Sequence, residues 1–161
     1  MTNETTPNEN AQPPATRNHR HGAVLVLFVL AMGVLYMMVE RGGGAPEGWL
    51  TDLDQAKRQA AAANRLLFVE FGADWCAACT QMKRTVFSQD RVRSALAEFV
   101  AVHVDVDAQK AIAIQHGVSM LPTFVVMDHK GGVLAKFEGA MPAEQLLGFL
   151  DAHRRVRVRQ P

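Results

Sequence analysis

The chain has 161 residues, a formal net charge of +1 and a sequence pI near 7.9. A chain of this length holds about one domain with appendages, because domains run to roughly 100–200 residues. The balanced charge gives no electrostatic case for nucleic-acid binding, which would call for a basic face, so no nucleic-acid partner is expected. Part of the 48% hydrophobic content lies in one apolar run near the N-terminus.

The N-terminal region combines a polar tail with this apolar run. Residues 1–21 are rich in Asn, Thr, Pro and Gln and show no apolar periodicity, which predicts a disordered tail. From Gly22 to Val39, 18 consecutive residues are uncharged and mostly apolar. A helix rising 1.5 Å per residue over this length just about spans a hydrocarbon core of roughly 30 Å. The sequence therefore predicts a transmembrane anchor over residues 22–39.

The residues that flank the apolar run predict its orientation. Two arginines and two histidines lie within residues 17–21, whereas Glu40 and Arg41 follow the run. The positive-inside bias puts the N-terminus in the cytoplasm and the rest of the chain in the periplasm, as a single-pass protein of the bacterial inner membrane. The alternative is a signal peptide cleaved near residues 42–45, although its apolar region usually has only about 7–15 residues. Either way, the cysteines face an oxidising compartment.

After the run, residues 40–48 form a predicted linker, 49–155 a compact domain and 156–161 a basic tail. The domain is predicted to begin with a helix that is capped by Thr51 or Asp52, ends near Asn64 and has one apolar face: Leu53, Ala56, Ala60 and Ala63. A strand over 66–71, a helix that carries the cysteines to about Phe87, and a helix over 91–98 capped by Ser88 or Asp90 follow. The remaining predicted elements are a strand over 99–107, a helix over 108–116, hairpin strands over 123–127 and 133–137, and a last helix that Pro142 begins.

This order of elements predicts an α/β fold. Parallel strands joined by helices, followed by an antiparallel pair, give a mixed central sheet with helices on both faces. In such folds the site lies beyond the carboxyl end of a strand, which is where Cys76 falls.

Cys76 and Cys79 are the only cysteines of the chain, and they form a Cys-x-x-Cys pair after a predicted strand. No further thiol is present to build a structural disulfide framework. A zinc site would need two more ligands, and the sequence has neither a second Cys-x-x-Cys nor a His-x-x-x-His motif. The pair therefore indicates redox chemistry, with no metal and no cofactor expected.

The positions of the two cysteines predict different roles. Cys76 starts a helix, where free N–H groups and the macrodipole favour a thiolate, so it is the predicted nucleophile. Cys79 lies one turn later and would resolve the mixed disulfide. Glu70 is a lone carboxylate in an apolar run and is the predicted acceptor of the Cys79 proton. The alternative is that Glu70 is an exposed residue at the end of the strand and takes no part in the reaction. The intervening Ala77 and Ala78 supply no imidazolium, which favours a reductase over a strong oxidant.

Three longer motifs carry a resemblance to a known family. They are Ala73-Asp74-Trp75-Cys76-x-Ala78-Cys79, Thr85-Val86-Phe87-Ser88 and Leu121-Pro122-Thr123-Phe124. With these motifs the chain resembles the thioredoxin superfamily, and in particular the C-terminal periplasmic domain of DsbD-type thiol:disulfide interchange proteins. The resemblance covers roughly residues 49–161. It implies a thioredoxin-like fold, a redox-active disulfide between Cys76 and Cys79, and a buried acid at Glu70.

The resemblance also implies a substrate-binding edge. Pro122, 43 positions after Cys79, matches a cis-proline that faces the active site in the superfamily, the alternative being an ordinary trans turn. Leu121 would then expose backbone groups that pair with substrate as an added strand. Trp75 is expected to cover one side of the disulfide, with simple core packing as the alternative.

The sequence departs from the DsbD pattern at two points. DsbD-type proteins carry a multi-helix membrane domain that transports electrons, whereas one 18-residue segment conducts none, so a separate integral membrane electron donor is expected. Lys83 is basic where the resemblance implies an acid. The exact thiol pKa tuning of that family therefore does not transfer to this chain.

The function expected from the sequence is a membrane-anchored periplasmic thiol:disulfide oxidoreductase that reduces disulfide-containing periplasmic proteins. One alternative is a cytochrome c maturation thioredoxin, although the gap before Pro122 leaves little room for the insertion typical of those proteins. Another is a Cu(I)-binding assembly factor that uses both cysteines and Met120, although the chain lacks the partner histidine motif. The histidines of the domain are scattered without ligand spacing and are interpreted as structural or exposed: His103, His116, His129 and His153.

Overall fold

A computed structural model describes residues 19–39 and 44–157. The chain divides into two compact units at Val39 and Glu40. The first unit contains the helix α1 (His19–Val39). Within the described residues, no helix is long and apolar enough to qualify as a membrane span, so the predicted anchor over residues 22–39 is not confirmed. Of the predicted tails over residues 1–21 and 156–161, residues 1–18 and 158–161 lie outside the described residues, as do residues 40–43 of the linker. Residues 19–21 belong to α1, and residues 156–157 are helical at the end of the domain.

The second unit is an α/β domain built on one sheet of four strands within residues 44–157. Its elements are α2 (Leu53–Ala63), β1 (Leu67–Gly72), α3 (Ala77–Thr85), α4 (Asp90–Leu96), β2 (Val100–Asp105), α5 (Lys110–Gln115), β3 (Thr123–Met127), β4 (Val133–Glu138) and α6 (Ala143–Arg157). The sheet order is β2-β1-β3-β4, with β1 and β2 parallel and the β1–β3 and β3–β4 pairs antiparallel. The predicted mixed sheet is confirmed.

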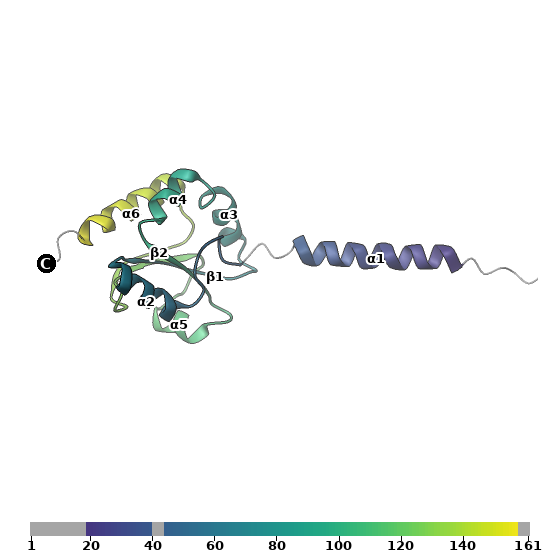
Figure 1. Ribbon diagram of the computed structural model, residues 1–161, viewed down its shortest axis with the longest axis horizontal. Coiled ribbons are helices and arrows are strands. Elements are labelled where there is room, and N and C mark those ends of the chain that lie inside the picture. The colour runs from purple at the N-terminus through teal and green to yellow at the C-terminus, as the bar shows by residue number, and fades with distance from the viewer. Residues whose placement is uncertain (1–18, 40–43, 158–161) are drawn as a thin grey trace, which may run out of the picture. The chain divides into compact units, whose positions relative to one another are not determined.

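Helices cover both faces of this sheet, as predicted. Figure 1 shows α3, α4 and α6 on one face and α2 and α5 on the other. Two apolar clusters fill the two interfaces. The first includes Phe68, Met82, Val92, Phe124 and Leu146, and the second includes Leu53, Ala56, Val69, Val102 and Val125. The two central strands, β1 and β3, supply both clusters because successive side chains of a strand point to opposite faces.

The helix ends show which sequence signals were correct. Asp52 caps α2, because its Oδ1 accepts a hydrogen bond from the Gln55 N–H at 2.7 Å, and Asn64 ends the helix in the left-handed conformation. The predicted cap of α4 is wrong, since Gln89 occupies the N-cap without a side-chain hydrogen bond. Ala63, predicted on the buried face of α2, is exposed because the helix ends there and the chain turns away.

The sheet brings the start of α3 to the carboxyl end of β1. The strand β1 runs to Gly72 in the middle of the sheet, and β2 lies beside it in parallel. The Val106 N–H donates to the Gly72 carbonyl at 2.9 Å, so the two strands remain paired past their ends. The turn that follows leads directly into the cysteine helix, at the edge where parallel strands of α/β folds form their sites.

Candidate active site

The two cysteines are joined in a disulfide at the first turn of α3. Their sulfurs are 2.10 Å apart and their Cα atoms 5.3 Å apart. Cys76 is the N-cap residue of α3, and its Sγ accepts a hydrogen bond from the Cys79 N–H at 3.1 Å. Helix-start N–H groups and the helix dipole stabilise negative charge on this sulfur. The local structure therefore suits Cys76 to carry a thiolate when the pair is reduced.

The disulfide is almost enclosed by protein. Cys76 is 5% exposed and Cys79 is 4% exposed, and with Ala73 they form a small buried cluster. Val106 and Leu121 pack against this cluster from the loops after β2 and before β3. Segments distant in the sequence thus enclose the sulfurs, which is an arrangement that excludes water from the pair.

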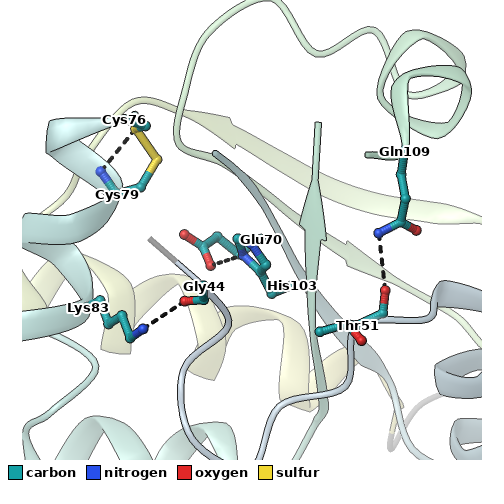
Figure 2. Close-up of polar contacts among 8 residues, drawn as sticks. All are labelled: Gly44, Thr51, Glu70, Cys76, Cys79, Lys83, His103 and Gln109. Atoms are coloured by element: carbon teal, nitrogen blue, oxygen red, sulfur yellow. Dashed lines mark hydrogen bonds and ion pairs between the residues drawn. A yellow bond between two sulfur atoms is a disulfide. The ribbon is translucent and has the colours of Figure 1, made fainter. Parts of the chain in front are cut away.

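Below the disulfide lies a pair of buried ionisable side chains. Glu70 and His103 are 3% and 4% exposed, and Glu70 Oε2 lies 2.9 Å from His103 Nδ1. They are direct neighbours in the parallel register of β1 and β2. Figure 2 shows their side chains facing each other between the two strands, with the cysteines on the neighbouring helix. The predicted burial of Glu70 is confirmed. Its partner is His103, a histidine interpreted from the sequence as structural or exposed.

The alternation of the strands explains why this pair faces α3. Phe68 of β1 belongs to the cluster under α3, α4 and α6, so Glu70, two residues later, points to the same face. Val102 and Val104 of β2 belong to the opposite cluster, which turns His103 to the α3 face. The register then sets the two side chains opposite each other.

Gly72 marks the point where the site groups converge. A Cβ atom added to Gly72 would lie 3.0 Å from His103 Cε1, 3.3 Å from Glu70 Oε1 and 3.5 Å from Cys79 Sγ. Glu70 Oε1 and Cys79 Sγ therefore both border the space beside the Gly72 Cα, while Glu70 Oε2 is engaged by His103.

The loop before β3 supplies the edge of the site. The Leu121–Pro122 peptide bond is cis, as predicted. The Thr123 hydroxyl donates to the Met120 carbonyl at 2.6 Å, and the Gly139 N–H donates to the Pro122 carbonyl at 2.8 Å, which ties this loop to β4. Pro122 is buried and Leu121 is half-buried against the cysteine cluster, whereas Met120 is 54% exposed.

Trp75 lies outside the core. It is 70% exposed, so the alternative of core packing is wrong. Its indole N–H donates to Asp107 Oδ2 at 2.7 Å, and Asp105 Oδ1 in turn accepts from the Asp107 N–H at 2.8 Å. This network fixes the indole on the loop after β2, beside the cysteine turn. No motif or pattern in the sequence singles out Asp107.

The remaining candidates have other surroundings. The Lys83 ammonium donates to the Gly44 carbonyl at 2.8 Å, which ties α3 to the segment that leads into the domain. Among the described residues, no cluster of three or more histidine, cysteine or carboxylate side chains is placed to hold a metal ion. His116 is half-buried against the Phe71 ring, at 5.6 Å between ring centroids.

The fold and this site define a class of protein. The family model described as a thioredoxin-like domain matches residues 53–154, so the chain belongs to the thioredoxin-like family. Together with the Cys-x-x-Cys pair at the start of α3, this membership makes it a thioredoxin-like thiol:disulfide oxidoreductase.

Curated relatives point in the same direction. DsbD of Ralstonia nicotianae, a thiol:disulfide interchange protein, is 37% identical over 81 residues, which are 50% of this chain and 12% of that protein. Thioredoxin H4 of Arabidopsis thaliana is 34% identical over 57% of this chain and 71% of its own length. DsbD of Escherichia coli is 32% identical over 68% of this chain. The match spans only 19% of the Escherichia coli protein.

Solved structures share the fold. A thioredoxin from Thermus thermophilus is 30% identical, covers 65% of this chain and 85% of its own, and has a TM-score of 0.59. The C-terminal domain of Neisseria meningitidis DsbD in the oxidised form, at 20% identity, covers 65% of this chain and 98% of its own with a TM-score of 0.55. The predicted relationship to thioredoxins and to the DsbD C-terminal domain is confirmed.

Proposed function

We propose that the chain is a membrane-anchored, periplasm-facing oxidoreductase that reduces disulfides of client proteins. The observation that carries this proposal is the placement of the two sulfurs: Cys76 caps α3, and Cys79 Sγ borders the same space beside Gly72 as the buried Glu70 carboxylate. One cysteine is arranged for attack and the other for deprotonation in a site shielded from water. A dithiol with these properties reduces a disulfide in two exchange steps.

The first step uses the Cys76 thiolate. It attacks one sulfur of the client disulfide, a bond forms between Cys76 and that sulfur, and the other client sulfur leaves as a thiolate that takes a proton from water. The N–H groups at the start of α3 stabilise the attacking charge. Cys76 is therefore the proposed nucleophile.

The second step uses Cys79. Its thiol loses a proton to Glu70, its sulfur attacks Cys76 Sγ, and the bond between Cys76 and the client breaks. The second client sulfur leaves as a thiolate that takes a proton from water, Glu70 keeps the Cys79 proton, and the protein holds the Cys76–Cys79 disulfide. A buried carboxylate suits this step because the proton has no direct path to water.

The edge formed by Leu121 and Pro122 is the proposed docking surface for clients. Leu121 lies against the cysteine cluster, and the loop's backbone would pair with an extended client segment as an added strand. The exposed side chains of Trp75 and Met120 would provide apolar contacts beside it. These clients are periplasmic proteins with disulfides.

The cellular setting is part of the proposal. The uncharged run from Gly22 to Val39 and the positive residues before it support an anchor that holds the domain in the periplasm of a bacterial inner membrane. The matched segments cover 12% and 19% of the two DsbD proteins. An integral membrane protein that returns electrons to the disulfide is part of the same proposal.

The reduction potential of the Cys76–Cys79 pair tests the direction of electron flow. We expect a value close to the roughly −270 mV of thioredoxin, because the Ala77-Ala78 dipeptide supplies no charge that stabilises the reduced form strongly. The measurement is equilibration in dithiol/disulfide buffers followed by alkylation of free thiols. A value near about −120 mV, typical of a strong oxidant, would contradict the reductase direction.

A further inference from the structure

His103 is a buried ionisable group that the mechanism above does not use. Within the described residues, the buried polar or charged side chains are Glu70, His103 and Thr123. Thr123 is satisfied by the Met120 carbonyl, whereas Glu70 and His103 satisfy each other. A buried ion pair is a poor source of stability, because desolvation offsets its attraction. The pair therefore calls for a role other than holding the fold together.

The two oxygens of the Glu70 carboxylate face different partners. Glu70 Oε2 lies 2.9 Å from His103 Nδ1, and when the carboxylate is ionised it only accepts, so the hydrogen bond then requires the Nδ1–H tautomer as donor. Oε1 lies on the Gly72 side, where Cys79 Sγ also approaches. The residue opposite Glu70 on β3 is Phe124, whose ring offers no competing donor. His103 thus engages one oxygen, and the other borders the space beside Gly72 that the sulfur also borders.

Without this hydrogen bond, no donor on the neighbouring strand would hold Glu70 Oε2 in this orientation. Proton transfer requires the acceptor to lie within hydrogen-bond reach of the thiol, directly or through one water. Fixing Oε2 on the neighbouring strand limits the positions that Oε1 adopts, and correct orientation contributes strongly to such rates.

We propose that His103 is the positioning residue of the resolving step, holding Glu70 Oε2 so that Oε1 receives the proton of Cys79. This inference rests on the proposed function. In the mixed disulfide, the S–H proton of Cys79 moves to Oε1, the Cys79–Cys76 bond forms, and the Cys76–client bond breaks with its electron pair on the client sulfur. The client thiolate takes a proton from water, and Glu70 returns its proton when a dithiol donor reduces the disulfide again.

A single-turnover reaction separates the two steps. The full-length reduced protein is mixed with an aromatic disulfide whose released thiolate is coloured. The first thiolate reports attack by Cys76, and the second reports resolution by Cys79. For His103→Leu, which removes the donor, we expect the first phase within about twofold of wild type and the second slowed about tenfold or more.

Three comparisons distinguish positioning from a general structural effect. His103→Gln, whose amide N–H donates to Oε2, should restore the second phase to within a few-fold of wild type. Glu70→Gln combined with His103→Leu should be no slower than Glu70→Gln alone, because His103 acts through Glu70. His129→Leu, in the hairpin loop, is the matched control and should leave both phases unchanged.

The inference is overturned if His103→Leu resolves as fast as wild type, or if it slows both phases equally. If that variant does not fold, the NMR chemical shifts of the His103 imidazole nitrogens in the wild-type protein show whether Nδ1 carries the proton. We expect Nδ1 of His103 to be protonated in the reduced protein, and an unprotonated Nδ1 would refute the donation. A wild-type protein that releases no second thiolate would instead contradict the proposed function itself.

Discussion

At the scale of single residues, Gly72 keeps open the space in which the site groups meet. An added Cβ would lie closer than an ordinary contact to the imidazole of His103 and the carboxylate of Glu70, and in ordinary contact with the sulfur of Cys79. All three are buried, so none of them has room to yield. A glycine at the end of a strand is usually explained by a backbone conformation that other residues avoid. At Gly72 the reason is instead that neighbouring side chains occupy the space where a Cβ atom would lie.

The Gly72→Ala variant tests this account. We expect a loss of about 1–3 kcal/mol in the free energy of unfolding, which is typical of overpacking, together with slower resolution by Cys79. The measurement is urea denaturation followed by circular dichroism. The matched control is Gly148→Ala on α6, where nothing lies within 4 Å of the added Cβ. This control should gain about 0.5–1 kcal/mol from helix propensity, and a neutral Gly72→Ala would contradict the close approach.

His116 provides a second prediction at this scale. Burial, followed by the positive charges of Lys57 and Lys136, lowers the pKa of His116 below its usual 6.5. An NMR titration of the imidazole should therefore place its midpoint below that of the unfolded chain in urea. Lys57→Met should raise the midpoint, because it removes one of the two repelling charges. A midpoint above the unfolded value would contradict the environment described for this ring.

The lowered pKa of His116 determines how its contribution to the free energy of unfolding depends on pH. Because the pKa of His116 is lower in the folded protein than in the unfolded one, the unfolded chain binds more protons in this range. The contribution of His116 to stability is therefore fully present above about pH 6.5 and is lost as the pH falls through the folded-state value. Denaturation at several pH values should show this loss in the wild type and a smaller one in His116→Gln.

At the scale of elements, the cap of α2 is the clearest local determinant. Asp52 is exposed and its carboxylate accepts from the Gln55 N–H, so its effect on stability is separable from core packing. We expect Asp52→Ala to lose about 1 kcal/mol, and Asp52→Asn to lose little because an amide oxygen also caps. Thermal denaturation measures both. Equal losses in the two variants would mean that the side-chain hydrogen bond does not stabilise the helix.

The helices and strands show which structural features could be predicted from the sequence alone. The apolar run of β1, the alternation of β2 and the turn of the β3–β4 hairpin were sufficient to predict the strands and their mixed order, because each signal is local. The cap of α4 was not predictable from residue preference, since Gln89 carries no capping hydrogen bond. The cis bond before Pro122 was predicted only through the resemblance, because an isolated X-Pro bond is rarely cis.

Only part of the site could be predicted, because only some of its residues carry a local sequence signal. Cys76, Cys79 and Glu70 carry signals in their own segments, namely a motif, a helix start and a lone charge in an apolar run. His103 and Asp107 carry none. Their partners are set by the register of β2 against β1 and by the loop that follows, which are contacts between segments about 30 positions apart. Alternation places His103 on the same side of β2 as residues 101 and 105, but register could not be derived from a single sequence.

At the scale of the whole molecule, the proposed anchor makes a separate prediction. Full-length protein expressed in a bacterium should stay in the membrane fraction after an alkaline carbonate wash. Leu27→Arg places a charge within the apolar run, costs about 2.5–3.5 kcal/mol on insertion scales, and should reduce membrane retention. Leu27→Ile is the control. Recovery of a shortened wild-type protein in the soluble periplasmic fraction would favour the cleaved signal peptide instead.

The division of roles between the two cysteines is the central claim, and trapping of clients tests it most directly. Cys79→Ala removes the resolving thiol, so client proteins should accumulate as mixed disulfides on Cys76 in growing cells. The adducts should disappear on reduction and in the Cys76→Ala/Cys79→Ala control. Adducts on Cys79 in Cys76→Ala, with none on Cys76 in Cys79→Ala, would reverse the proposed roles. Disulfide-linked clients in neither variant would contradict the mechanism as a whole.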